Sequence, residues 1–370
     1  MPKEEEPKSE IEQIEEELKN TKYNKHTQFH IGKLKAKLAM LKEKDKKAKS
    51  GGARGYGYGL RKSGDATVLL VGFPSVGKSS LLNVITNADS KVGAYDFTTI
   101  DVIPGVLEYR GAKIQILDVP GIIEGVASGK GRGKEILAVV RNADLVIMVL
   151  DSKKAEAQYE ILSKELHDAG FRLNEKPPEV FIHKKIDGGL HIQTVARGKD
   201  SLPKDMIKEI LMEMKLLNAE IVIREDINID RLIDAVQGNR IYVRALPVVN
   251  KVDLLSQAEM RSLSSRFKGA LFVSATEKEN IDAIREGVWR ALGFVRVYMK
   301  RLGKEADKKE PLIMKEGVTV KDVCEKIHKE WANKFKFAKI WGKSARFPGQ
   351  EVGFEQILQD EDVVEFHMER

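Results

Sequence analysis

A phosphate-binding loop is the most specific chemical motif in this sequence. The segment GFPSVGKS, from Gly72 to Ser79, matches the pattern G-x-x-x-x-G-K-[ST]. It lies between the apolar run TVLLVGF and the helical stretch SSLLNVIT, so backbone N–H groups and a helix N-terminus would face bound phosphates. Lys78 would neutralise the β- and γ-phosphates and the Ser79 hydroxyl would ligate Mg²⁺, whereas a purely structural turn gives no reason for the lysine. The predicted nucleotide-binding positions here are Pro74, Ser75, Val76, Gly77, Lys78, Ser79 and Ser80.

Two further segments supply candidate contacts to Mg²⁺ and the γ-phosphate. Asp118 ends the apolar run IQIL, where an acidic residue would lie on the Mg²⁺ side, and Gly121 would offer its backbone N–H to the γ-phosphate. In the segment YDFTTID, Thr98 and Thr99 are candidates for the hydroxyl that completes the Mg²⁺ shell, although adjacent threonines also suit an ordinary strand. The predicted catalytic residues are Lys78, Thr99 and Gly121, and the predicted metal ligands are Ser79, Thr99 and Asp118.

The base-recognition residues predict GTP rather than ATP. The segment NKVD, residues 250–253, follows the apolar run ALPVV. A carboxylate at Asp253 accepts hydrogen bonds from N1–H and the 2-amino group of guanine, and adenine has no such pair of donors. Asn250 and Lys251 would fix this loop. A second segment at a predicted strand end, Ser274-Ala275-Thr276, would place a backbone N–H against guanine O6, and the four motifs in this order together predict GTP binding.

Short apolar runs alternate with helical stretches from Thr67 onward, and they place these motifs at strand ends. The runs TVLLVGF, IQILDVP, DLVIMVLD, ALPVVNK and ALFVSA are nearly continuous in apolar residues, which is typical of strands buried on both faces. Helical crossovers between them predict an α/β fold with a doubly wound, mainly parallel sheet. The runs GVLEYR and AKIQILD, separated near Gly111, predict an antiparallel hairpin at one edge.

The same patterns divide the chain into regions. Residues 1–50 predict two amphipathic helices with a break near Thr21 to Asn24, and residues 51–64 form a glycine-rich linker. We assign residues 65–170 and 245–295 to the nucleotide-binding domain. Residues 171–244 form a small α+β insertion, with helices from Lys204 to Leu217 and from Ile229. Residues 296–370 form a compact C-terminal unit, with a helix around Val320 to Phe335 and a closing strand in DVVEFHM.

The basic charge is concentrated near the N-terminus. Residues 1–18 hold eight Glu against two Lys, and residues 19–62 hold fourteen Lys or Arg against two acidic residues, while the whole chain carries +7. This predicts an arm that touches a polyanion, with a solvated helix face as the alternative. In the C-terminal unit, lysines are interleaved with Trp331, Phe335, Phe337 and Trp341. These aromatic residues suit either RNA stacking or the core of a small domain.

Composition excludes several classes of protein. A chain of 370 residues that is 42% hydrophobic can bury a substantial core and is not disordered. Cys324 is the single cysteine and cannot form an internal disulfide, and no apolar run approaches the roughly 20 residues of a membrane helix. The N-terminal segment MPKEEEPKSE is too polar for a secretory signal. We therefore expect a cytoplasmic protein, with no metal site at His183 and His191, which lack an accompanying ligand cluster.

The motifs GFPSVGKSSLL, DFTTI, DVPGIIEG, NKVD and SAT, with the preceding KSGDA, resemble those of the developmentally regulated GTP-binding proteins (DRG), which are Obg-related GTPases. The resemblance covers nearly the whole chain. It implies a helical N-terminus, an insertion between the third and fourth motifs, and a C-terminal TGS-like β-grasp domain. It also implies a cytoplasmic GTPase that associates with translating ribosomes and is stimulated by K⁺. An Asn helps to hold the ion in related potassium-dependent enzymes, and the matching residue here is Ser75.

The sequence thus predicts a switch that binds GTP and Mg²⁺, hydrolyses GTP slowly and engages the ribosome or ribosomal RNA. An activating regulatory protein is a further expected partner, whereas a membrane and sequence-specific DNA are not. The alternative is an RNA-binding scaffold in which the nucleotide only stabilises the fold. A phosphotransferase acting on a small molecule is disfavoured because the sequence suggests no acceptor site.

The residue that follows the D-x-x-G motif generates a prediction. Many small GTPases have a Gln there that orients the attacking water, but this chain has Ile122, whose aliphatic side chain cannot do so. Hydrolysis must then depend on a main-chain group, a cation, another residue such as Glu124, or a partner. We expect Ile122→Ala to leave the slow intrinsic turnover within a few fold, measured as phosphate release by the purified protein. A collapse of the rate would contradict this.

Overall fold

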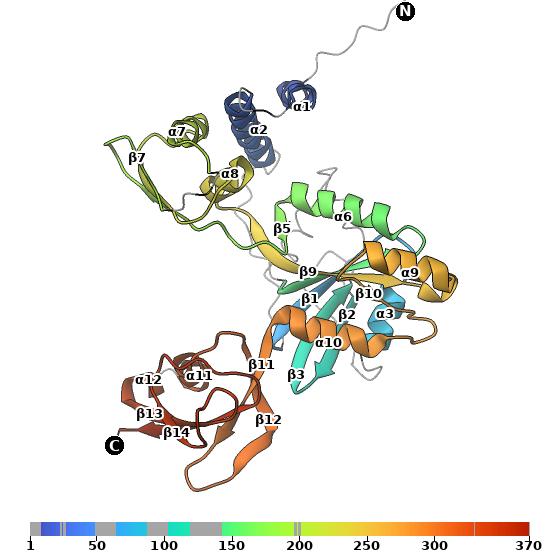
Figure 1. Ribbon diagram of the computed structural model, residues 1–370, viewed down its shortest axis with the longest axis vertical. Helices are drawn as coiled ribbons and strands as arrows, with labels where there is room; N and C mark the ends of the chain where they lie inside the picture. The colour runs from blue at the N-terminus through green and yellow to red at the C-terminus, as the bar shows by residue number, and fades with distance from the viewer. Residues whose placement is uncertain are drawn as a thin grey trace, which may run out of the picture. The chain divides into compact units, whose positions relative to one another are not determined.

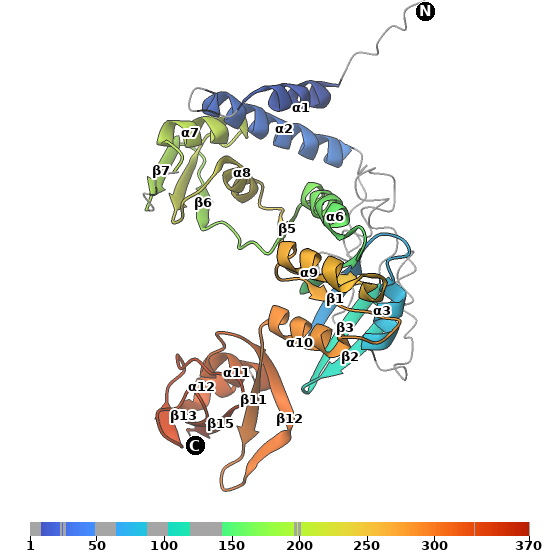
Figure 2. The ribbon, with the colours of Figure 1, turned by 45° about the vertical axis from the view of Figure 1, so that its right-hand side comes forward.

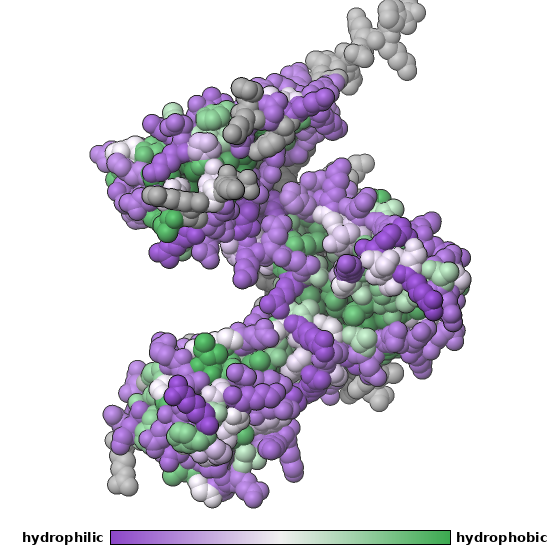
Figure 3. Space-filling model, in the orientation of Figure 1, coloured by the Kyte–Doolittle hydropathy of each residue, from purple (hydrophilic) through white to green (hydrophobic). Residues whose placement is uncertain are grey.

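The computed structural model describes residues 9–22, 24, 27–48, 64–86, 103–118, 143–195, 198, 201–328 and 330–369. The chain divides into two compact units (Figure 1). The first combines Met1–Gly57 with Glu175–Tyr242, and the second combines Tyr58–Asn174 with Val243–Arg370. Hydrophilic residues cover most of the surface that faces the viewer in both units (Figure 3). None of the helices in the described residues has the length and apolar character needed to cross a membrane.

A seven-stranded sheet forms the centre of the second unit. Its strands are β1 (Ala66–Val71), β2 (Ile103–Tyr109), β3 (Ala112–Asp118), β4 (Leu145–Asp151), β5 (Phe171–Leu173), β9 (Ile241–Asn250) and β10 (Leu271–Phe272). They lie in the order β10-β9-β4-β1-β3-β2, with β5 paired to β9. Neighbours from β10 to β3 run parallel, and β2 runs antiparallel to β3. The predicted α/β fold class and the edge hairpin are therefore confirmed.

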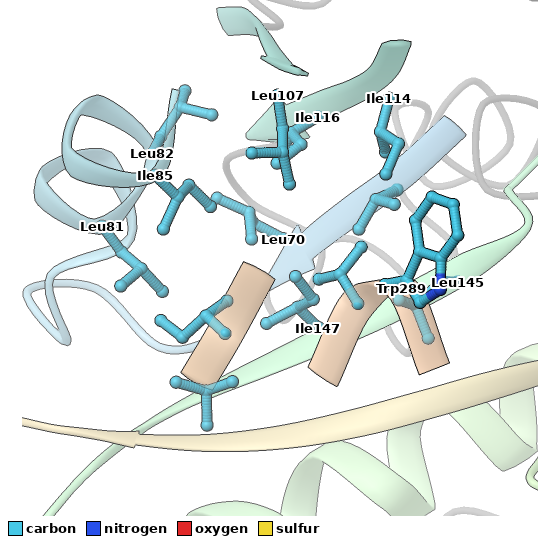
Figure 4. Close-up of a cluster of buried hydrophobic side chains, with 14 of the residues drawn as sticks. Leu70, Leu81, Leu82, Ile85, Leu107, Ile114, Ile116, Leu145, Ile147 and Trp289 are labelled. Atoms are coloured by element: carbon cyan, nitrogen blue, oxygen red, sulfur yellow. The ribbon is translucent and has the colours of Figure 1, made fainter. Parts of the chain in front are cut away.

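Burial on both faces explains the apolar runs of this sheet. All six residues of β1 are buried. One face packs under α3 (Lys78–Ile85) and α10 (Ile281–Leu292), where Leu70, Leu81 and Trp289 belong to one core cluster (Figure 4). Two further helices are α6 (Ala155–Ala169) and α9 (Gln257–Arg266). Helix α6 contacts β4 and β5, and its buried Leu162 and Leu166 lie outside that cluster.

In the first unit the second N-terminal helix packs with the predicted insertion around one core, and the first N-terminal helix lies against the second (Figure 2). Its helices are α1 (Glu10–Asn20), α2 (Gln28–Ala48), α7 (Lys204–Glu213) and α8 (Ile229–Gln237). Its strands are β6 (Val180–Lys184), β7 (Leu190–Thr194) and β8 (Ala219–Ile223), with β8 in the centre, antiparallel to β6 and parallel to β7. Residues 1–50 and the insertion were predicted as separate regions, so the core that α2 shares with the insertion is a finding of the structure.

Small residues on α2 permit this close packing. Ala36 is fully buried in the same cluster as Ile210 of α7. A Cβ atom on Gly32 would lie 3.3 Å from Ile210 Cδ1, which leaves little room for a larger residue.

Helix α1 begins at a capping box, in which Ser9 Oγ accepts from Glu12 N–H and the Glu12 carboxylate accepts from Ser9 N–H.

A five-stranded sheet and two short helices form the C-terminal part of the second unit. Its elements are β11 (Phe294–Lys300), β12 (Ala306–Lys315), α11 (Val320–Ile327), α12 (Trp331–Lys334), β13 (Phe335–Trp341), β14 (Gln350–Val352) and β15 (Asp362–Met368). The strand order is β12-β11-β15-β13-β14, and β11 and β15 run parallel in the middle. This arrangement agrees with the predicted β-grasp class.

Two predicted helices end earlier than the sequence analysis placed them. The helix predicted from Lys204 to Leu217 ends at Glu213, and Lys215 has a φ of 60°, which does not continue a helix. The helix predicted around Val320 to Phe335 is interrupted at His328, which is extended. Phe335 then begins β13. Apolar periodicity alone did not show these backbone changes.

The shared core of the first unit can be tested with Ile210→Ala. Ile210 is 1% exposed, and truncating a buried Ile to Ala costs about 2–5 kcal/mol of folding free energy. We expect hydrogen exchange to accelerate in α2, α7 and β8 together, because these elements share the core, while β1 and β4 keep their protection. The exposed Ile161→Ala on α6 is the matched control, because that side chain is 47% exposed. Unchanged protection of α2 would show that the N-terminal helices do not depend on this core.

Candidate functional site

A pocket of about 360 Å³ lies where the phosphate-binding loop meets the ends of β9 and β10. The carboxyl ends of parallel strands share one edge of a sheet, so motifs far apart in sequence meet there. Nine of the positions predicted from the sequence line this pocket. They are Ser75, Gly77, Lys78, Ser79, Ser80, Asn250, Lys251, Ala275 and Thr276.

Backbone conformation and a buried lysine shape the phosphate-binding loop. Ser75 and Gly77 have φ values of 60° and 92°, so the loop turns sharply before α3 begins at Lys78. Lys78 Nζ donates to the carbonyls of Gly72 and Phe73 at 3.1 and 3.0 Å. Burial lowers the pKa of Lys78, while nearby Asp118 acts to raise it. The ammonium group is thus held at the loop, where a phosphate would compensate its loss of water.

The loop contains two predicted residues that do not contribute side chains to the pocket. Val76 is 1% exposed and belongs to the hydrophobic core, so it can offer only its backbone to a ligand. Pro74 is exposed and has no N–H to donate. Neither residue lines the pocket, so its loop wall is formed by Ser75, Gly77, Lys78, Ser79 and Ser80.

Ser79 and Asp118 form the part of the site that fits Mg²⁺. Ser79 Oγ donates to Asp118 Oδ2 at 2.9 Å. Asp118 is 3% exposed, and its buried Oδ1 has no hydrogen-bond partner among the described residues. A buried carboxylate oxygen without a donor is costly unless a cation or water satisfies it. Mg²⁺ in nucleotide sites commonly uses one or two carboxylates together with substrate phosphates, so this hydroxyl and carboxylate fit the ion.

The amide of Asn250 joins the phosphate-binding loop to the Ser274–Thr276 segment. Asn250 is 2% exposed, and its Nδ2 donates to the Val76 carbonyl at 2.9 Å. Its Oδ1 accepts from the Ala275 N–H at 3.0 Å. A Cβ atom on Gly77 would lie 2.4 Å from Asn250 Nδ2, so the loop needs glycine at this point. One side chain thus fixes the spacing between two walls of the pocket.

Lys251 holds the loop from a second position. Its Nζ donates to the Ser75 carbonyl at 2.7 Å and to Asp151 Oδ2 at 2.8 Å. Ser152 Oγ donates to the Lys251 carbonyl at 2.8 Å, which supports a residue whose φ is 64°. The sequence analysis did not identify Asp151 or Ser152 as site residues. In the sequence, the position of Asp151 at the end of the predicted strand DLVIMVLD could have identified it as a site residue.

The base-recognition residues lie at the same end of the sheet. Asp253 is exposed in the short 3₁₀ helix η1 (Val252–Leu254). Ser274 is fully buried, and its Oγ accepts from the Glu277 N–H at 3.1 Å. Ser274 therefore shapes the turn that carries Ala275 and Thr276 to the pocket. The predicted residues Thr98, Thr99 and Gly121, like Ile122 and Glu124, lie outside the described residues.

Ion pairs in the first unit neutralise several of the lysines on α2. Lys33 and Lys35 pair with Glu209 and Asp230 of the insertion at 2.9 and 2.7 Å. Lys37 pairs with Glu10 of α1 at 2.8 Å, and the hydrogen bond that Lys37 donates to Glu10 raises the pKa of Lys37. These pairs are largely exposed, so each contributes little stability and a phosphate can compete for the lysine.

The aromatic residues of the C-terminal sheet divide between its two faces. Phe335 stacks on Phe354 with ring centroids 4.0 Å apart in the core cluster. Phe337 stacks on His367 at 4.4 Å. Because buried Ala338 and Ile340 alternate with them, Phe337 and Trp341 lie on the opposite face of the sheet. The strand register shifts between Phe335 and Phe337, so Phe335 can lie on the core face. The core interpretation therefore holds for Phe335.

Among the described residues, no group of three or more His, Cys, Asp or Glu side chains is placed to hold a metal ion. The fit to Mg²⁺ at Ser79 and Asp118 does not conflict with this, because nucleotide oxygens would supply further ligands there.

Comparisons with known proteins agree with the geometry of the site. Residues 67–185 match the family described as 50S ribosome-binding GTPase, residues 187–294 match the C-terminal region of that domain, and residues 295–368 match the TGS domain. An uncharacterized GTP-binding protein of Methanocaldococcus jannaschii is 48% identical, over 98% of this chain and 93% of its own length. The human developmentally-regulated GTP-binding protein 2 is 42% identical, over 96% of this chain and 97% of its own. The solved structure of a GTP-binding protein from Pyrococcus horikoshii OT3 aligns with a TM-score of 0.42 and 15% identity, over 82% of this chain and 99% of that chain, which is too distant to carry an argument.

The Lys251–Asp151 pair predicts a pH-dependent contribution to stability. Burial acts to raise the pKa of Asp151, but the hydrogen bonds from Lys251 and Lys153 N–H outweigh it and lower the pKa below its ordinary value of 3.8. A lowered carboxyl pKa means that the pair stabilises the fold above the ordinary value and loses this effect as the pH falls through the folded-state value. We expect Asp151→Asn to reduce stability by about 1–3 kcal/mol at neutral pH, measured by denaturant unfolding.

The difference between Asp151→Asn and the natural protein should shrink as the pH falls from 3.8 through the lower folded-state pKa of Asp151, below which both side chains are neutral. Asp168→Asn on α6 is a control, since the Asp168 side chain is 56% exposed and lies far from the pocket in sequence. A difference at Asp151 that is independent of pH would show that the charge of this residue is not what stabilises the loop.

Proposed function

This chain belongs to the family of developmentally regulated GTP-binding proteins, and from that membership we propose that it hydrolyses GTP with Mg²⁺ and acts as a switch associated with the ribosome or ribosomal RNA. The observation that carries the enzymatic part is the pocket in which the phosphate-binding loop, Asn250 and Ala275 meet. The chain is a GTP-binding protein of a GTPase family, and this pocket would supply contacts for phosphate and base from separate strands.

The pocket supports binding through fixed positive charge and oriented N–H groups. Lys78 would exchange its two carbonyl partners for the β- and γ-phosphates, and the N-terminus of α3 would face the same oxygens. Asp253 would accept from guanine, and the Ala275 segment, fixed by Asn250, would face O6. Preorganised donors of this kind stabilise charge that develops on the transferring phosphoryl group.

Mg²⁺, when bound, would neutralise phosphate charge. Ser79 and Asp118 would hold the ion, with Thr99 as the proposed third protein ligand. The unsatisfied Asp118 Oδ1 supports this assignment. Our proposed catalytic residues are Lys78, Thr99 and Gly121.

Turnover is expected to be slow without a partner. Ile122 replaces the Gln that positions water in many small GTPases. A ribosome or an activating regulatory protein would then supply or order the missing group. The family description as a 50S ribosome-binding GTPase supports the ribosome as that partner.

Two regions are proposed to engage ribosomal RNA, and both are basic. Residues 19–62 carry the excess of positive charge, and the exposed ion pairs of α2 can open to phosphate. In the C-terminal domain, Trp331 is 39% exposed and Phe347 is 61% exposed beside Arg346. Such a translation-linked role would place the protein in the cytoplasm.

Stimulation by K⁺ is a separate proposal that depends on Ser75. The Ser75 carbonyl already accepts from Lys251 Nζ, so a second cation at this loop would use the hydroxyl or other oxygens. Equal turnover in K⁺ and Na⁺ buffers would contradict it.

GTP hydrolysis with and without ribosomes tests the main proposal. We expect slow turnover by the purified protein in K⁺ buffer with Mg²⁺ and a clear increase when ribosomes are added, because the chain lacks its own water-positioning Gln. Lys78→Ala should abolish both rates, and Lys304→Ala, an exposed lysine outside the pocket, should leave them unchanged. The readout is phosphate release.

Binding of GTP without turnover in either condition would contradict the switch. That result would favour the alternative, an RNA-binding scaffold in which the nucleotide is structural. A rate that persists in Lys78→Ala would show that a contaminating enzyme is responsible.

A further inference from the structure

The outward face of the small sheet in the first unit carries side chains that the nucleotide site does not use. Helices α2, α7 and α8 share a core with the inward residues of β6, β7 and β8. Figure 2 shows these helices gathered on one side of the strands. Alternate residues of each strand point away from that core, because side chains in a strand alternate between its faces.

The first outward row contains an exposed aromatic ring supported by a cation. Phe181 lies opposite Val222, and Val222 lies beside Gln193. Phe181 is 55% exposed, although burial of a Phe side chain is normally favourable by about 1.5–3 kcal/mol. The Arg224 guanidinium carbon lies 4.8 Å from the Phe181 ring centroid. The ring is therefore held in place while more than half of its surface stays in solvent.

The second outward row contains two imidazoles around a carboxylate. His183 lies opposite Glu220, and Glu220 lies beside His191 on the other neighbouring strand. Both histidines are exposed. Lys185 forms an ion pair with Glu220 at 3.1 Å, so the carboxylate charge is already neutralised by a neighbouring residue. The two rows and the side chains paired with them hold two cations, Arg224 and Lys185, two imidazoles and a single carboxylate, Glu220.

We infer that this sheet face binds single-stranded RNA, with unstacked bases lying on Phe181 and the two imidazoles and with Arg224 near the phosphates. Aromatic rings and imidazoles on an open sheet are the groups on which single-stranded bases stack. Glu220 lies between the two imidazoles, Gln193 ends the Phe181 row on β7, and both can bond to base edges. Base-paired RNA fits poorly, because its bases are already stacked and recessed in the helix.

The chemistry of the face favours RNA over a protein partner. Phe181 and Val222 form its one apolar pair in the two rows, and the other members are imidazoles, an amide and charged groups. Protein docking sites that bind stably have a contiguous apolar centre, and this face has none in these two rows. The inference extends the proposed RNA-linked role to a third surface, and it does not depend on GTP turnover.

Crosslinking of the full chain to a short single-stranded RNA that contains 4-thiouridine tests this inference. We expect crosslinked peptides from β7 and β8, identified by mass spectrometry. Phe181→Leu should lower the crosslink yield on those two strands at least about fivefold, because Leu is apolar but has no ring for stacking. Phe181→Tyr should keep the yield. Arg224→Ala should make the dependence of this yield on salt shallower, since one phosphate contact is lost.

Several outcomes would overturn the inference. RNA bound to the protein without crosslinks on β7 or β8 would place binding on the basic arm or the C-terminal domain instead. Equal yields for Phe181→Leu and Phe181→Tyr would indicate an apolar surface for a protein. Equal crosslinking to a duplex of the same sequence would exclude base stacking. GTP turnover is measured in parallel, so its absence with crosslinks still present on these strands would contradict the proposed function alone.

Discussion

The buried amide of Asn250 is the interaction on which the nucleotide site depends. It hydrogen-bonds both to the phosphate-binding loop at Val76 and to the predicted base-recognition segment at Ala275. Val76 lies 174 residues from Asn250 in sequence. Both bonds lie in the protein interior, where an unmade hydrogen bond costs about 1–3 kcal/mol. The amide also sets the space beside Gly77, in which a Cβ atom would clash. The width of the pocket is therefore fixed before any nucleotide enters.

The parallel sheet makes that bridge possible. β1, β4 and β9 are adjacent and parallel, so their carboxyl ends bring the loop, Asp151 and Asn250 to one edge. Lys251 then adds a second clamp between Asp151 and the Ser75 carbonyl. Within the described part of this edge, Asp118 Oδ1 is a buried side-chain oxygen without a hydrogen-bond partner, and it fits Mg²⁺. The site is preorganised for a charged ligand because its own charges are held by the backbone.

The first unit shows that part of the basic N-terminal segment also belongs to a folded core. The net charge of residues 19–62 predicted a basic arm, yet α2 packs into the core of the insertion through Ala36 and pairs its lysines with local acids. The cations remain exposed, so they can still meet RNA. These cations therefore belong to a folded unit, whose three-stranded sheet presents its own aromatic and basic face.

The sequence by itself determined the α/β class, the edge hairpin and the positions of the motifs, because apolar runs and the spacing of the phosphate-binding loop are local signals. It could not show that Asn250 and Lys251 hydrogen-bond to the loop, or that Asp151 forms an ion pair with Lys251. Those contacts join residues about 100 or more positions apart. It placed two helix ends too late because apolar periodicity does not report the positive φ of Lys215 or the extended His328. The pairing of His183 and His191 across Glu220 was likewise decided by strand register, which only the tertiary fold sets.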